Sequence, residues 1–217
     1  MKSPLRITAV LFDLDGTLAD SAGDLALALN RIRESRGLAA IPAEDLRPYA
    51  SSGARGLLHR GMGVTQDHPE YAALRELFLA NYSECLAETT TLFDGVSEAL
   101  DAIEARGLRW GIVTNKFERF AMPVVAALDL DRRAAVVVGG DTTPHAKPHP
   151  EPLLEAARRL KVAPAQCIYV GDDERDIVAG YGYMGTGSDP ALWPATGWID
   201  QPPELLDWLP TRDRFRR

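Results

Sequence analysis

Short apolar segments alternate with helical patterns along most of the chain, and this alternation restricts the fold more than any other feature. The apolar segments cover residues 7–12, 108–113, 134–138 and 167–170. Each is too short for a typical helix, and such short apolar runs are typical of strands buried on both faces of a parallel sheet. Helical patterns separate them, as β-α-β units with right-handed crossovers require. We therefore predict an α/β fold built on a parallel sheet.

The helical segments lie both between these strands and in one long stretch without a strand. Residues 40–91 show helical spacing only and predict an insertion of about two to four helices. Before it, Ser21 is a plausible helix cap with Asp24 three residues on, and Gly37 ends that helix. Further elements are expected as helices over 96–106, 119–128 and 151–160, a short strand at 198–199 and a short helix over 203–209.

The composition excludes some classes of protein. The chain has 217 residues, is 46% hydrophobic and carries a net charge of −7. Such acidity argues against a general nucleic-acid binder, which needs a basic surface for phosphates. The N-terminal apolar run is too brief for a membrane span or a signal-peptide core. We expect a cytoplasmic protein that binds neither nucleic acid nor membrane.

Reactive side chains follow the predicted strands. Ligands of open parallel sheets bind at the carboxyl ends of the strands. We therefore expect Asp13, Thr114, Lys147 and Asp172 to converge at one edge of the sheet.

Each of the first three motifs has a chemical and an ordinary interpretation. If extended geometry continues past the first strand, Asp13 and Asp15 point to the same side, where Mg²⁺ relieves their repulsion; the same residues also suit a simple turn. Thr114 and Asn115 can bind phosphoryl oxygens, and are equally common helix caps. Lys147 can neutralise a phosphoryl group, whereas most lysines are ordinary surface residues.

The fourth motif is an acidic run over 172–176. Asp172 can reach a metal, and Asp176 can brace Lys147 or bind metal-bound water; an acidic helix start is the ordinary alternative. His145 and His149 are four residues apart, but the proline between them argues against a helical metal pair.

Together, the four motifs resemble those of the haloacid dehalogenase superfamily. Within it the chain is most similar to phosphoglycolate phosphatases. The segments that support this placement are Phe-Asp-Gly-Val at 93–96, Val-Thr-Asn-Lys at 113–116, Lys-Pro-His-Pro at 147–150 and Ser-Gly-Ala-Arg at 52–55. The resemblance implies a Rossmann-like parallel-sheet core of residues 1–18 and 92–217, with a small inserted α-helical cap domain of residues 19–91.

The resemblance also implies roles for individual residues. Asp13 is the expected nucleophile, which forms an aspartyl-phosphate, and Asp15 the expected acid and base. Thr114, Asn115 and Lys147 are expected to hold the phosphoryl oxygens.

The implied cofactor is Mg²⁺, held by the carboxylates of Asp13 and Asp172 and the backbone carbonyl of Asp15, with Asp176 in a supporting role. Arg55 is the candidate for binding a substrate carboxylate; a solvated helix residue is an equal alternative.

The expected function is Mg²⁺-dependent hydrolysis of a small phosphomonoester, 2-phosphoglycolate first, by a monomer or homodimer. Alternatives are a phosphatase for N-acetylmuramic acid 6-phosphate and a sugar-phosphate mutase. A dehalogenase is disfavoured, because dehalogenation has no need of Asp15. A non-catalytic binding module is the alternative class, because Gly180 runs directly into a Tyr-Gly-Tyr segment where such proteins normally have another strand.

Overall fold

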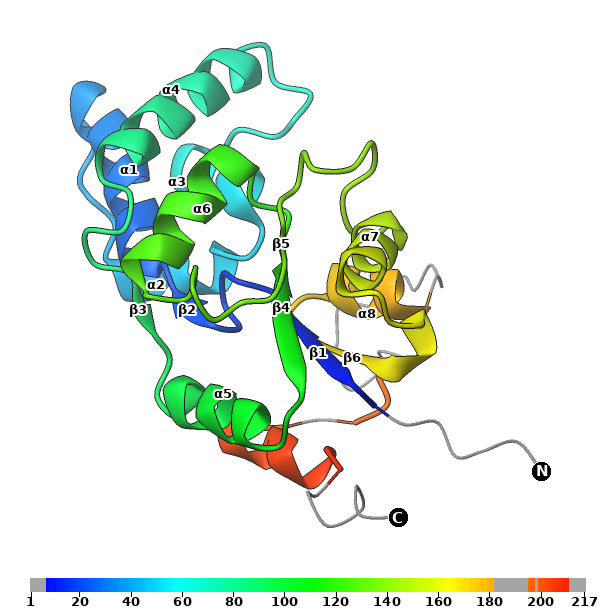
Figure 1. The fold of residues 1–217 in the computed structure, drawn as a ribbon. Coiled ribbons are helices and arrows are strands. Elements are labelled where there is room, and N and C mark those ends of the chain that lie inside the picture. The colour runs from blue at the N-terminus through cyan, green and yellow to red at the C-terminus, as the bar shows by residue number, and fades with distance from the viewer. Residues whose placement is uncertain (1–6, 182–194, 198, 211–217) are drawn as a thin grey trace, which may run out of the picture.

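The structure, a computed structural model, describes residues 7–181, 195–197 and 199–210. Within them, a parallel sheet has the strand order β5-β4-β1-β6. The strands are β1 (Ala9–Phe12), β4 (Arg109–Val113), β5 (Val137–Val138) and β6 (Cys167–Val170). Helices cover both faces of this sheet (Figure 1). The predicted α/β class with a parallel sheet is confirmed.

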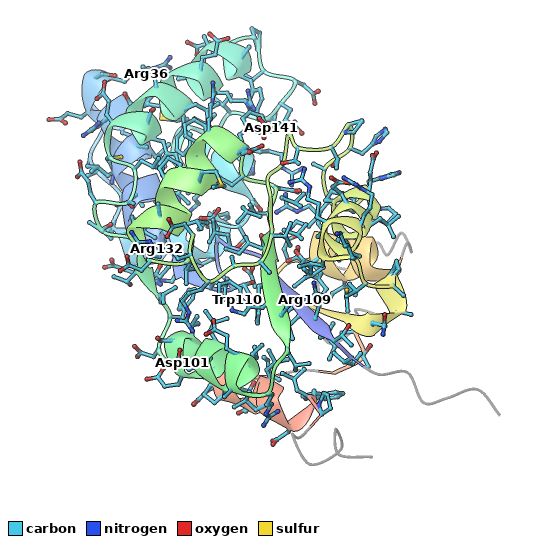
Figure 2. The ribbon with its side chains drawn as sticks, viewed as in Figure 1. Arg36, Asp101, Arg109, Trp110, Arg132 and Asp141 are labelled. Atoms are coloured by element: carbon cyan, nitrogen blue, oxygen red, sulfur yellow. The ribbon has the colours of Figure 1, made fainter. Side chains whose placement is uncertain are left out.

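The sheet is buried because alternate strand residues face two different layers of helices. Val10, Phe12 and Trp110 share a hydrophobic cluster with residues of α5 (Val96–Ala105), α6 (Glu118–Ala127) and the 3₁₀ helix η4 (Pro202–Asp207). Ala9 and Leu11 pack instead with residues of α7 (Glu151–Leu160). Figure 2 shows Trp110 on β4, where its ring meets that of Phe12 edge-on at 6.4 Å between centroids. This two-sided packing explains why the strands read as unbroken apolar runs.

Two further helices flank β6 in the chain, one before it and one after it. The 3₁₀ helix η2 (Pro164–Gln166) leads into β6, and α8 (Glu174–Tyr181) leaves it. Residues predicted as helix over 151–160 and as strand over 167–170 have those bounds in the structure.

A separate group of helices lies to one side of the sheet, at the top left of Figure 1. Its members are α1 (Ala22–Ser35), α2 (Ala43–Leu46), the 3₁₀ helix η1 (Arg47–Tyr49), α3 (Gly53–Met62) and α4 (Tyr71–Glu84). They bury a hydrophobic cluster of their own, which also takes in Phe120 of α6. Two short antiparallel strands, β2 (Ala19–Asp20) and β3 (Thr91–Leu92), connect the group to the sheet. The helices predicted for 40–91 are therefore present.

The prediction that the Ser21 side chain caps α1 is wrong. The side chain of Ser21 makes no capping hydrogen bond; its hydroxyl donates to Asp15 Oδ1 at 2.5 Å. Asp24 is fully buried and accepts hydrogen bonds from the Thr89 backbone N–H and from the hydroxyls of Thr89 and Thr90. Ser21 thus ties the helix to the turn six residues before it, and Asp24 ties it to a segment 65 residues further on.

Some boundaries differ from the sequence expectation. The strand predicted over 134–138 is limited to the two residues of β5. The expected helix over 203–209 is η4, and the expected strand at 198–199 is not formed by Ile199, while Trp198 lies outside the described residues. The sequence predicts that a strand is missing after Gly180. Residues 182–194, which follow there, also lie outside the described residues. Among the described residues, no helix is long and apolar enough to cross a membrane.

Candidate active site

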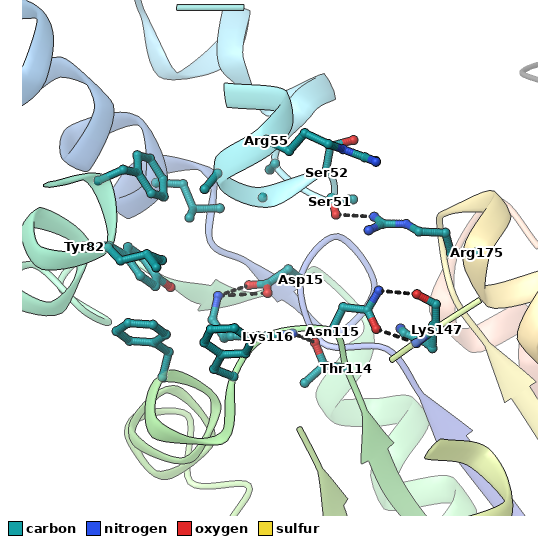
Figure 3. A pocket seen from close by; sticks show the side chains of 18 of the residues that line it. Asp15, Ser51, Ser52, Arg55, Tyr82, Thr114, Asn115, Lys116, Lys147 and Arg175 are labelled. Carbon is teal, nitrogen blue, oxygen red and sulfur yellow. Dashed lines mark hydrogen bonds and ion pairs between the residues drawn. The ribbon is translucent and has the colours of Figure 1, made fainter. Parts of the chain in front are cut away.

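The strand ends bring four predicted residues to one place. Asp13 follows β1, Thr114 follows β4, and Asp172 lies two residues beyond β6. Lys147 reaches the same edge from the loop between β5 and α7. Asp13, Thr114 and Lys147 line a pocket with a cavity volume of about 260 Å³ (Figure 3), whereas Asp172 lines a smaller neighbouring hollow. The predicted convergence is present, although Asp172 lines the neighbouring hollow and not the pocket itself.

Lys147 is the centre of a buried polar cluster. Its Nζ lies 3.0 Å from Asp13 Oδ1 and 2.7 Å from Asp176 Oδ1, and it donates to the Val113 carbonyl and to the Tyr169 hydroxyl. The side chain of Lys147 is only 2% exposed. Burial alone would lower its pKa, but the two carboxylates outweigh burial and the pKa of Lys147 is raised. The lysine is therefore held charged, and the predicted bracing of Lys147 by Asp176 is present.

Asn115 fixes the backbone of the lysine loop. Its Nδ2 donates to the Lys147 carbonyl at 2.8 Å, and its Oδ1 accepts the Lys147 backbone N–H at 2.9 Å (Figure 3). An amide with one donor and one acceptor matches the two groups of a single peptide residue. In this arrangement Asn115 positions Lys147.

Three carboxylates form a cluster that suits a hard divalent cation. Oxygens of Asp13, Asp172 and Asp176 all lie within 4.8 Å of one another. Burial raises the pKa of Asp13 to about 6, against the pull of the Lys147 charge. Burial, together with the charge of Asp13, also raises the pKa of Asp172. Since Mg²⁺ prefers carboxylate oxygens and would relieve this strain on the charged forms, the donor set fits Mg²⁺.

Gly16 makes the approach of Asp172 possible. Its φ of +87° lies in the left-handed region, and an added Cβ would meet Asp172 Oδ2 at 2.2 Å. The hydroxyls of Thr17 and Ser51 donate to the two oxygens of Asp172 at 3.0 and 2.6 Å. The turn after Asp13 therefore packs directly on the acidic run, and only glycine fits at this position.

Asp15 is not arranged as the spacing argument predicted. Extended geometry ends at Phe12, and Asp15 lies in a tight turn where Gly16 N–H bonds the Ala19 carbonyl. Its carboxylate lines the pocket but is paired with Lys116 Nζ at 2.8 Å (Figure 3). The two carboxylates therefore line one pocket but pair with different lysines, Asp13 with Lys147 and Asp15 with Lys116.

Lys116 is a site residue that sequence reasoning did not single out. It comes from the loop between β4 and α6, and its Nζ lies 4.8 Å from the centroid of the Tyr82 ring of α4. Burial acts to lower its pKa, but the neighbouring Asp15 charge prevails and the pKa of Lys116 is raised. Its sequence signal is the segment Val-Thr-Asn-Lys at 113–116, in which it directly follows Asn115.

The helical group contributes a loop and two arginines. The Ser51 carbonyl accepts a hydrogen bond from Arg175 Nη2 at 2.5 Å, beside the contact of its hydroxyl with Asp172. Arg55 of α3, predicted to bind substrate, lines the pocket, as does Arg75 of α4. Lys116 and Arg175 line it too, but each is paired with an acid, Asp15 and Asp173 respectively.

Comparison with known proteins identifies the class. The family model for haloacid dehalogenase-like hydrolases matches residues 10–183. The chain belongs to this family, and the family predicted from the four motifs is confirmed.

Similar proteins narrow the comparison. A phosphoglycolate phosphatase of Xanthomonas campestris pv. campestris (strain 8004) is 44% identical, over 93% of this chain and 95% of that protein. An N-acetylmuramic acid 6-phosphate phosphatase of Pseudomonas aeruginosa PAO1 is 40% identical, over 94% and 96%. The crystal structure of a haloacid dehalogenase-superfamily hydrolase from Geobacter sulfurreducens PCA has a TM-score of 0.72 and 25% identity, and covers 94% of this chain and 97% of that one.

Proposed function

We propose that the chain is a Mg²⁺-dependent phosphomonoester hydrolase that works through an aspartyl-phosphate on Asp13, with 2-phosphoglycolate as its substrate. The observation that carries the proposal is the buried Asp13 at the end of β1, with Lys147 at 3.0 Å and two further carboxylates beside it. The family membership and the phosphatase names of the relatives support it.

The surroundings of Asp13 suit an attack on phosphorus. The Leu14 backbone N–H donates to its Oδ1 at 2.7 Å, and Lys147 Nζ contacts the same oxygen. Both contacts orient the carboxylate, so that Oδ2 forms the new bond to phosphorus while the ester P–O bond breaks. Lys147 and the Thr114 hydroxyl balance the charge on the phosphoryl oxygens, and Asn115 keeps Lys147 in place.

Asp15 supplies and removes the proton. In the first step its carboxyl protonates the leaving ester oxygen. In the second, its carboxylate takes a proton from the attacking water, and the bond between phosphorus and Asp13 breaks to release phosphate. Lys116 Nζ and the Ser21 hydroxyl hold the Asp15 carboxylate in the pocket.

The carboxylates of Asp13 and Asp172, with the backbone carbonyl of Asp15, would hold the magnesium ion, and Asp176 supports them. Bound there, Mg²⁺ screens the negative nucleophile from the negative substrate. Excess chelator is expected to abolish turnover, and undiminished activity would remove the metal from the proposal.

We also propose the division into a core of residues 1–18 and 92–217 and a cap of residues 19–91. Its support is the separate hydrophobic cluster of the helices and the β2–β3 ladder, which lies at both boundaries. A small phosphomonoester is the proposed partner, in the cytoplasm, with the protein as a monomer or homodimer. The net charge of −7 supports the absence of a nucleic-acid partner.

The pocket supports a small substrate that bears a carboxylate. Its cavity of about 260 Å³ lies just under the range of roughly 300–1,000 Å³ that holds drug-sized ligands. Arg55 of α3 and Arg75 of α4 line it from the helical group, where they suit a second anionic group. A phosphate and a carboxylate on a short stem, as in 2-phosphoglycolate, match this arrangement.

N-acetylmuramic acid 6-phosphate is the second candidate. The half-buried side chains of Tyr71, Leu79 and Phe117 also line the pocket and offer apolar surface to a larger substrate. One relative carries the name of this phosphatase. Assaying both compounds side by side with Mg²⁺ and comparing kcat/KM distinguishes them; a higher value for the amino sugar would replace 2-phosphoglycolate as the substrate.

Asp13→Asn tests the nucleophile. The amide cannot form the acyl-phosphate, so turnover is expected to vanish while far-ultraviolet circular dichroism stays unchanged. Retained turnover by the folded variant would exclude Asp13 as the nucleophile.

Arg55→Ala tests the carboxylate contact. A lost charge-assisted hydrogen bond of about 1.5–3 kcal/mol predicts a roughly 10- to 100-fold fall in kcat/KM for 2-phosphoglycolate, with little change for an aryl phosphate. Arg60→Ala is the matched control, because Arg60 is exposed on the same helix but does not line the pocket. Equal losses on both substrates would reject the assignment.

A further inference from the structure

Two imidazoles and a carboxylate meet in the loop that carries Lys147, outside the pocket described above. His145 and His149 stand on either side of this lysine, and their ring centroids are 4.4 Å apart with an angle of 31° between the planes. The intervening proline argued against a metal pair on a helix, and the two residues are indeed not helical. The loop brings the rings together instead, next to Glu151 in the first turn of α7.

All three side chains present a donor atom to a common point. His145 Nδ1 lies 2.7 Å from Glu151 Oε2, and His149 Nδ1 lies 3.8 Å from the same oxygen. The donor atoms of the three residues all lie within 4.8 Å of one another. A tetrahedral zinc ion with bonds of about 2.0–2.1 Å keeps its ligand atoms roughly 3.3 Å apart. The two observed distances bracket this value.

We propose that His145, His149 and Glu151 form a second metal site, which takes Zn²⁺ or a similar transition-metal ion. Imidazole nitrogens favour such ions over Mg²⁺, which prefers oxygen ligands. The side chains of His145 and His149 are 63% and 50% exposed, so water can complete the coordination and the ion can enter. The site is thus different in chemistry from the carboxylate cluster of Asp13, Asp172 and Asp176.

The present hydrogen bonds show what the ion displaces. His149 Nδ1 accepts the Glu151 backbone N–H at 3.2 Å, so its lone pair is occupied and a bound ion displaces this hydrogen bond. His145 Nδ1 and Glu151 Oε2 are hydrogen-bonded at 2.7 Å, and a bound ion takes the place of the hydrogen between them, while the ring carries its hydrogen on Nε2. Binding therefore exchanges these two hydrogen bonds for metal–ligand bonds.

The site is coupled to Lys147 by the chain itself. Asn115 holds the backbone of Lys147 at its N–H and carbonyl, between the two histidines. An ion that joins residues 145, 149 and 151 closes the loop around this lysine. The side chain of Lys147 points to Asp13, so the ion joins the outer side of the same loop.

The test is calorimetric titration of Zn²⁺ into the full chain in excess Mg²⁺. Because Zn²⁺ also competes for the carboxylate cluster, the readout is the difference between variants. We expect His149→Ala to bind one equivalent fewer than the unchanged chain, or to bind that equivalent at least about tenfold more weakly. His145→Ala and Glu151→Gln are expected to do the same.

His68→Ala is the matched control. His68 Nδ1 accepts the Glu70 backbone N–H at 3.2 Å, which repeats the local motif of His149 without a second imidazole. It should bind Zn²⁺ like the unchanged chain. Equal stoichiometry and affinity for the unchanged chain and His149→Ala, or an equal loss in His68→Ala, would overturn the site.

Two further measurements keep the result independent of folding. Mg²⁺-dependent turnover should persist in His149→Ala, because its exposed ring contacts none of the proposed catalytic residues. In nitrogen-15 spectra of the four histidines, Zn²⁺ should shift the ring signals of His145 and His149 and leave those of His59 and His68 in place. Shifts at all four rings, or at neither of the first two, would also overturn the proposal.

Discussion

Lys147→Met isolates the electrostatic role of the buried lysine. Methionine keeps most of the apolar stem and removes the ammonium group, so Asp13 and Asp176 lose the cation that lies between them. Asp176 is fully buried and Asp13 is 7% exposed, which leaves little water to take over. Removing one partner of a buried ion pair typically costs about 3–5 kcal/mol, because the remaining charge is uncompensated.

The geometry gives a similar magnitude. Oxygens of Asp13 and Asp176 lie within 4.8 Å, and two unit charges at that separation repel by roughly 3.5 kcal/mol at an effective dielectric constant of 20. We expect urea denaturation at pH 7.5 with chelator to show a loss of about 3–5 kcal/mol in the free energy of unfolding. Lys161→Met, at an exposed lysine, is the control and should change it by less than about 0.5 kcal/mol.

The loss should depend on pH with a defined sign. Burial already raises the pKa of Asp13 to about 6, from an ordinary value of 3.8, with the lysine in place. Without it the pKa rises further, so the folded variant binds a proton that the unfolded chain has released. The loss relative to the unchanged protein is therefore fully present above the folded pKa of the variant, and it shrinks as the pH falls from there towards about 6, where Asp13 of the unchanged protein also binds its proton.

Mg²⁺ should also reduce the loss, because the ion supplies positive charge at the same carboxylates and should bind the variant, which lacks the competing ammonium group, more tightly than the unchanged protein. A loss under about 1 kcal/mol, or one that neither acid nor Mg²⁺ reduces, would refute the reasoning.

Two further substitutions test the turn and the second lysine. Gly16→Ala forces a Cβ into Asp172 Oδ2 at a φ of +87° and should weaken activation by Mg²⁺. Gly107→Ala is the control, because Gly107 has a φ of +72° and no atom within 4 Å of an added Cβ, so this variant carries only the backbone cost of about 1–3 kcal/mol. Equal Mg²⁺ activation constants for the two variants would contradict the close approach. Lys116→Met frees the Asp15 carboxylate, so kcat should fall about 10- to 100-fold for an alkyl phosphate and less for a nitrophenyl phosphate, whose leaving group needs little protonation; steady-state kinetics on both esters checks this.

The elements that sequence predicted well are those with purely local signals. The strand at 167–170 and the helix at 151–160 have the predicted bounds because one is a short apolar run after a turn and the other a periodic pattern that starts at a proline. The convergence of Asp13, Thr114 and Lys147 also follows, since parallel strands place their carboxyl ends at one edge.

What sequence could not supply depends on contacts between distant segments. Ser21 has the features of a helix cap, yet its hydroxyl finds the Asp15 carboxylate, and the acid three residues on finds the threonines near β3. Lys116 gains its role only when Asp15 from the first turn and Tyr82 from α4 enclose it. No spacing rule relates residues 15, 82 and 116, because their neighbourhood exists only in the folded chain.

Ser51 extends this argument to the relation between the helical group and the carboxylate cluster. Its hydroxyl donates to Asp172 Oδ2, and its carbonyl accepts from Arg175, so one residue joins the α1–α4 group to the proposed metal ligand and to the helix that follows it. A carboxylate oxygen has two lone pairs, and the hydroxyl and a cation can therefore share Asp172. Any change in the position of this loop changes the donors around Asp172, and linkage makes the effect reciprocal. Metal affinity and the contact between the helices and the sheet are thus properties of one shared carboxylate.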